Sequence, residues 1–241
     1  MRRYIYFVFL LCCAVNLLLT SCVRQKYVVM DMVHHNPGEA MTESKFLDPS
    51  FLKKNEYGAK VFFLFEAAQF GIDWKSFDPS LFPDTTEAGR WVAEKAEIIH
   101  KKYDAAKKED LQVYCMLDML VLPSLLVEKH RTELTNEQGK LDISKPYTQL
   151  CIRELMKEMF ETFPQLDGLV IRTGETYLHD APYYVGNHPV QNGMYDHITL
   201  INLLREEVCE RRNKKLFYRT WDMGQLHSIP KYYLSVTDSI E

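Results

Sequence analysis

Short apolar runs alternate with longer segments of helical periodicity along most of the chain. The apolar runs are the length of buried strands, and they predict strands over 26–33, 60–65, 111–117, 168–171 and 216–220. Between them, apolar residues recur at spacings of three and four, as on one face of an amphipathic helix. This pattern predicts helices over 46–56, 84–106, 146–163 and 198–215, and a last helix from Pro230. The segments 67–83, 118–145 and 178–193 are predicted to be irregular.

Strict alternation of strands and helices predicts an α/β fold with a parallel sheet and right-handed crossovers. A doubly wound sheet would often carry a glycine-rich phosphate loop after its first strand, but the sequence there is HHNPGE. The loops that follow the strands are long and polar, whereas those that precede them are short, which favours a (β/α)₈ TIM-type barrel. Five strand-helix units are present instead of eight, so we expect an incomplete barrel that lacks its C-terminal half.

The first residues are typical of a bacterial export signal. Arg2 and Arg3 precede an apolar segment that is too short and too close to the N-terminus to favour a membrane-spanning helix. The segment ends in LTSC at Cys22, which resembles the cleavage and lipidation motif of bacterial lipoproteins. The expected organisation is a signal peptide over 1–21, lipidated Cys22 and a tether over 22–25, and a barrel-type domain over 26–241. A lipid-anchored protein of the cell envelope, periplasmic or on the cell surface, follows from this interpretation.

Composition narrows the functional classes. A dispersed net charge of −4 argues against nucleic-acid binding. The cysteines beyond Cys22 form no metal-binding or redox pair, so we expect Cys115, Cys151 and Cys209 to be free core residues. His34 and His35 are adjacent, and adjacent strand residues point to opposite faces, so a metal site is not expected. The sequence predicts no cofactor.

Polar and aromatic residues gather where the predicted strands end. Two strands end in a similar phrase, Arg-Thr followed by an acidic residue two positions later, at Arg172 and at Arg219. Because parallel strands end at one edge of a sheet, these side chains are expected around one mouth. Carboxylates, arginines and aromatic rings together suit a sugar or sugar acid. The candidate substrate-binding residues are His34, His35, Glu66, Asp118, Arg172, Tyr177, Arg219, Trp221 and Asp222.

The fourth strand, which ends in Gly174-Glu175, together with the lipoprotein signal, resembles the (β/α)₈-barrel glycoside hydrolase superfamily. Residues 158–175 (EMFETFPQLDGLVIRTGE) look most like its α-glucuronidase and hexosaminidase-like branches. The resemblance implies that Glu175 is the general acid that protonates the glycosidic oxygen. It also implies that the second carboxylate usually follows a later strand, so this five-unit chain could be inactive alone; Asp222 is the local candidate.

Several roles stay open at this stage. Arg172 is able either to lower the pKa of Glu175 or to bind a substrate carboxylate, and Glu175 could instead be its structural partner. Asp118 and Trp74 suit a sugar site and a packed interior about equally. A non-catalytic glycan-binding lipoprotein is the alternative to a hydrolase, and a scaffold lipoprotein without a sugar ligand is a third interpretation.

Overall fold

The structure is a computed structural model, and it describes residues 28–31, 44–63, 66–174, 176–178, 180–191 and 193–219. Several predictions concern residues outside these ranges. They are the signal peptide with Cys22, the loop that holds His34 and His35, and the helix expected from Pro230.

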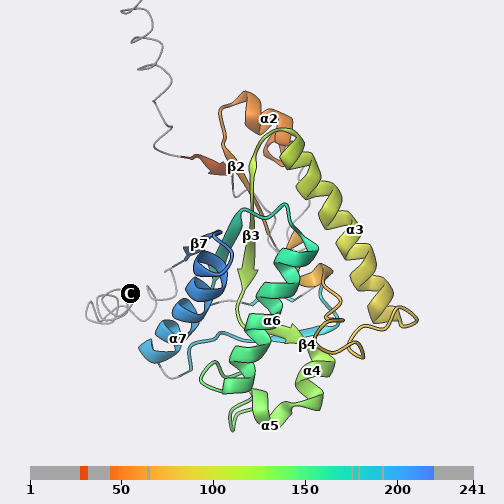
Figure 1. The fold of residues 1–241 in the computed structure, drawn as a ribbon, viewed down its shortest axis with the longest axis vertical. Coiled ribbons are helices and arrows are strands. Elements are labelled where there is room, and N and C mark those ends of the chain that lie inside the picture. The colour runs from red at the N-terminus through yellow and green to blue at the C-terminus, as the bar shows by residue number, and fades with distance from the viewer. Residues whose placement is uncertain are drawn as a thin grey trace, which may run out of the picture.

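The centre of the fold is a five-stranded sheet in which every neighbouring pair is parallel (Figure 1). Its order follows the chain: β1, β2, β3, β5, β7. The strands are β1 (Met30–Asp31), β2 (Ala59–Phe62), β3 (Gln112–Asp118), β5 (Gly168–Arg172) and β7 (Lys215–Tyr218). The predicted α/β class and parallel sheet are therefore confirmed.

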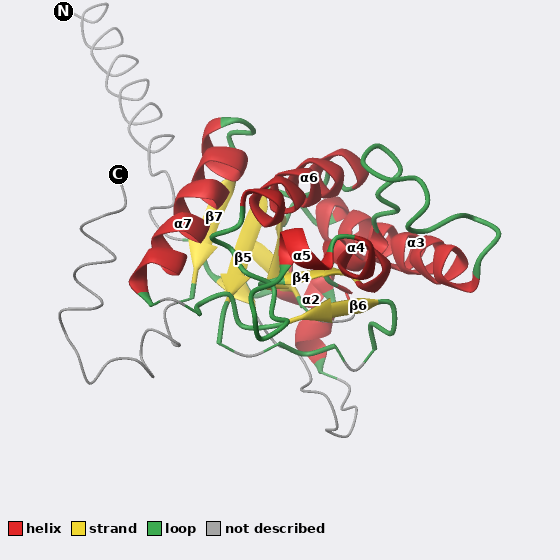
Figure 2. Cartoon of the chain, turned by 90° about the horizontal axis from the view of Figure 1, so that it is seen from below, coloured by secondary structure: helices red, strands yellow, loops and turns green. Residues whose placement is uncertain are grey.

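Helices lie between successive strands, as the periodicity predicts. They are η1 (Lys45–Leu47), α2 (Pro49–Lys54), α3 (Glu87–Lys108), α6 (Pro146–Thr162), α7 (Met194–Leu204) and the π-helical η4 (Arg205–Glu210). Figure 2 shows α3, α6 and α7 along the same side of the sheet. Pro146 opens α6, where the absence of an N–H is harmless. α3 begins three residues later than the predicted start at 84, and the hydroxyl of Thr86 caps it by accepting the hydrogen bond from Gly89 N–H.

Side chains that alternate along the strands form two separate apolar layers. In β3, Val113, Cys115 and Leu117 pack with the helices in the main core. Tyr114 and Met116 point to the opposite face, in a smaller cluster of strand residues to which α3, α6 and α7 contribute nothing among the described residues. We call this second surface the helix-free face. Both faces are apolar, as expected for a parallel sheet buried on two sides.

All three segments predicted to be irregular contain regular structure, and the first holds the short 3₁₀ helix η3 (Ala68–Gly71). The segment after β3 includes β4 (Val121–Pro123), α4 (Ser124–Lys129) and α5 (Arg131–Leu134). β4 pairs with β6 (Tyr184–Gly186), which lies in the loop after β5, to form a small antiparallel sheet. These elements were missed because their apolar runs are only a few residues long. The pairing joins the two loops at the carboxyl end of the main sheet.

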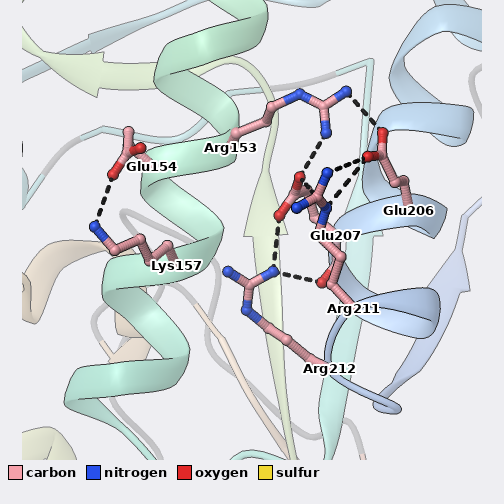
Figure 3. A network of polar contacts seen from close by, with 7 residues as sticks. All are labelled: Arg153, Glu154, Lys157, Glu206, Glu207, Arg211 and Arg212. Atoms are coloured by element: carbon pink, nitrogen blue, oxygen red, sulfur yellow. Dashed lines mark hydrogen bonds and ion pairs between the residues drawn. The ribbon is translucent and has the colours of Figure 1, made fainter.

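A network of charged residues fastens α6 to η4 (Figure 3). Glu207 is 4% exposed, accepts hydrogen bonds from Arg153 and Arg212, and forms an ion pair with Arg211. Glu206 accepts from Arg153 and Arg211. Hydrogen bonds from the arginines lower the pKa of Glu206, and the bond from Arg153 has the largest effect. This network therefore holds the last described helix against the rest of the helical layer.

The expectation for the cysteines beyond Cys22 can be compared with the described residues. Cys115 and Cys151 are buried free thiols and Cys209 is a half-buried one, as the sequence predicts. In the same part of the chain, no helix is both long and apolar enough to cross a membrane.

Candidate functional site

A buried ion pair joins the carboxyl ends of β3 and β5. Asp118 and Arg172 occupy paired positions in the ladder. Arg172 donates from Nε to Oδ1 of Asp118 at 2.5 Å and from Nη2 to Oδ2 at 2.8 Å. The two side chains are only 4–5% exposed. A forked, two-bond contact of this kind fixes the relative position of both strand ends.

Aromatic rings enclose the guanidinium of Arg172. Its centre lies 4.8 Å from the ring centroid of Phe63, which follows β2, and 4.4 Å from that of Tyr177. The amide of Tyr177 also donates to Oδ2 of Asp118 at 2.9 Å. Stacking and hydrogen bonding therefore tie the loop after β5 to the ion pair. Three predicted site residues, Asp118, Arg172 and Tyr177, are thus brought together.

These residues lie on the helix-free face. Asp118 continues the alternate positions of Tyr114 and Met116, and Arg172 continues that of Val170. Nη1 of Arg219, at the end of β7, lies 3.8 Å from the sulfur of Met116 on this face. The cluster therefore spans the carboxyl ends of four neighbouring strands of the sheet, β2, β3, β5 and β7.

Glu66 lies apart from this cluster. Its carboxylate pairs with Lys102 of α3, and its carbonyl accepts from the hydroxyl of Tyr103 at 2.9 Å. Both partners belong to the helical layer, so the side chain of Glu66 points away from the ion pair. Glu66 was predicted to share a mouth with Asp118. It does follow a strand, but its side chain lies on the helical side of the sheet.

The loops above the ion pair contain two residues that the sequence analysis did not select. Asn187 exchanges backbone hydrogen bonds with Leu120, and its side chain bonds both backbone groups of Leu141. His188 follows it, and its Nδ1 accepts from the N–H of Gly174 at 3.0 Å. Both residues lie in a long loop that follows a strand, and this position was the feature of the sequence that could have marked them as candidates.

Other candidates divide between the interior and the undescribed part of the chain. Trp74 is fully buried in the main core, which decides its open assignment in favour of packing. The remaining candidates lie outside the described residues, so their roles stay predictions: Glu175, His34, His35, Trp221 and Asp222.

Two titratable side chains of β3, Tyr114 and Cys115, are held in their neutral forms at physiological pH. Burial raises the pKa of Tyr114 to about 12 on the helix-free face. Burial also raises the pKa of the Cys115 thiol to about 12 on the opposite face. A thiol held in this state is a poor nucleophile. Within the described ranges, no group of three histidine, cysteine or acidic side chains could hold a metal ion.

Comparison with known proteins finds a distant likeness to solved structures. No protein-family model matches the chain, and no curated protein sequence matches it. The solved structure of a noncanonic maltogenic alpha-amylase from Thermotoga neapolitana aligns over 63% of this chain, with 15% identity and a TM-score of 0.36. The chain spans 40% of that protein's length. A likeness at this level assigns neither a family nor a substrate.

Proposed function

We propose that this chain is a carbohydrate-active lipoprotein of the bacterial envelope and that its sheet is part of a (β/α) barrel. The strand order supports the barrel, because it follows the chain without the reversal that a doubly wound sheet requires. The position of α3, α6 and α7 on one side of the sheet supports it as well (Figure 2). In such barrels the helix-free face becomes the interior.

The observation that carries the proposal is the cluster of Asp118, Arg172 and Tyr177 on this face, at the carboxyl end of the strands. Barrel enzymes build their sites at that end. The ring of Tyr177, which is half-buried, offers an apolar surface of the kind on which sugars stack, and polar groups of the surrounding loops would meet the sugar hydroxyls. The proposed substrate is an oligo- or polysaccharide, and no cofactor takes part.

Glu175 is proposed as the general acid for hydrolysis of a glycosidic bond. In the sequence it follows Gly174 directly and comes three residues after Arg172. A general acid needs a pKa near the working pH. Arg172 is bonded at two atoms by Asp118, and that pair carries no net charge. This compensation weakens the hypothesis that Arg172 lowers the pKa of Glu175.

The test is Glu175→Gln in the full chain, assayed with uronic-acid and hexosamine glycosides. We expect turnover to fall at least about a hundredfold while sugar affinity changes little, because only the proton donor is lost. Glu97→Gln is the matched control, since Glu97 is exposed on α3 and pairs only with Lys101 among the described residues. Turnover that survives Glu175→Gln refutes the acid assignment.

A glycan-binding protein without catalysis is the second candidate. It is favoured by the fact that both described carboxylates among the predicted site residues are engaged, Asp118 with Arg172 and Glu66 with Lys102. Neither is placed as a second catalytic carboxylate. Sugar binding measured by calorimetry, without turnover on any glycoside, would establish this function instead.

Lipid anchoring at Cys22 is tested separately. Cys22→Ser removes the thioether position, so we expect loss of incorporated radiolabelled fatty acid and release of the protein from the membrane fraction. Continued labelling of the Cys22→Ser protein would contradict the anchor.

A further inference from the structure

The N–H of Gly174 is the last backbone donor before Glu175, and it lies beyond the ladder of β5. The neighbouring strand ends engage Ile171 and Arg172: Arg219 N–H donates to Ile171 O, and Met119 N–H donates to Arg172 O. Gly174 has a φ of +100°, so the chain turns sharply there in a conformation that favours glycine. His188 supplies the acceptor for this N–H, at 3.0 Å from Nδ1.

The chain around His188 is itself held in place. Its carbonyl accepts from Nδ2 of Asn187 at 2.9 Å and from Nε2 of Gln191 at 2.6 Å. The backbone of Asn187 is bonded to Leu120 in both directions, at 2.8 and 3.0 Å. The ring of His188 therefore projects from a loop that is anchored to the segment after β3.

We infer that His188 is a positioning residue, which holds the backbone at Gly174, the residue before Glu175 in the sequence. The inference rests on the proposed function, in which Glu175 is the acid. Because a backbone N–H can only donate, Nδ1 of His188 carries no proton and the ring holds its proton on Nε2. Loss of this acceptor leaves the Gly174 N–H without its partner and frees the turn.

Three substitutions of His188 separate the acceptor from the shape of the ring. His188→Asn places an oxygen at the same number of bonds from Cα as Nδ1, so it keeps the acceptor. His188→Phe keeps a ring of similar size but has no acceptor. His188→Gln moves the acceptor one bond farther from the backbone. Urea unfolding of each protein shows whether it is folded.

The first measurement does not depend on enzyme activity. Thr173-Gly174 is the only Thr-Gly pair in the sequence, so ¹³C-carbonyl threonine combined with ¹⁵N-glycine selects a single amide signal by NMR. We expect slow hydrogen exchange of the Gly174 amide in the wild type and in His188→Asn. We expect exchange at least about fivefold faster in His188→Phe and His188→Gln, because a lost hydrogen bond is worth roughly 1 kcal/mol or more.

The second measurement is turnover. A misplaced acid should reduce kcat about tenfold to a hundredfold in His188→Phe and His188→Gln, with KM nearly unchanged and kcat restored in His188→Asn. Wild-type exchange and kcat in folded His188→Phe, or equal losses in His188→Asn and His188→Phe, would overturn the inference. If the wild type shows no turnover while the exchange series behaves as expected, the proposed function fails and the role of His188 in the turn is supported.

Discussion

The ion pair between Asp118 and Arg172 gives the sharpest stability prediction. Arg172→Met keeps much of the side-chain volume but leaves a carboxylate that is 4% exposed with no cation at two of its bonding positions. Breaking a buried pair from one side costs about 3–5 kcal/mol, because the remaining charge is neither hydrated nor compensated. Asp118→Leu should cost a similar amount, since it strands the guanidinium between Phe63 and Tyr177.

Replacing both partners should cost much less than the two single changes added together. The double variant Asp118→Leu/Arg172→Met buries no charge, and its main remaining penalty is the Tyr177 N–H that loses its acceptor, about 1–2 kcal/mol. We therefore expect a coupling energy of several kcal/mol between the two positions.

Urea unfolding followed by circular dichroism measures this coupling. With a slope of roughly 1–3 kcal/mol per molar urea, each single variant should shift the midpoint downward by about 1 M or more. The double variant should recover most of that shift. Losses that simply add would mean that the pair does not act as a unit, and the description of the strand ends as one locked site would be refuted.

Three smaller predictions concern other contacts. The Lys129 hydrogen bond lowers the pKa of Asp78 to about 2, below its value in the unfolded chain. The ionised Asp78 therefore stabilises the fold by about 1 kcal/mol above pH 4, and this stabilisation is lost as the pH falls toward 2. Asp78→Asn should remove this pH dependence of the urea midpoint. Glu207→Gln should cost about 1–3 kcal/mol in urea unfolding, whereas half-exposed Glu210→Gln should cost less than about 0.5. Gly168→Ala should cost about 1–3 kcal/mol in thermal unfolding, because its Cβ would lie 2.1 Å from a carbonyl oxygen of β7.

The order of strands and helices was predictable because it depends on periodicity alone. The apolar run before Arg172 and the proline at the start of α6 mark their elements directly. The small sheet of β4 and β6 was not predictable in this way. Its strands are three residues long, and they form because two distant loops meet above the ion pair. Contacts of that kind leave no local period in the sequence.

The position of a residue at a strand end did not decide which face its side chain occupies. Asp118 and Arg172 share a face because each continues the alternate positions of its own strand, with Met116 and with Val170. That alternation is readable in the sequence, but both sets of positions in β3 are apolar, so the sequence does not say which set meets the helices. Glu66 lies beyond the end of β2, where alternation no longer applies, and it turned toward Lys102. The residues that form a common site are therefore those whose side chains point to the same face of the sheet on neighbouring strands. The crossover helices cover one face and so decide which of the two faces holds the site.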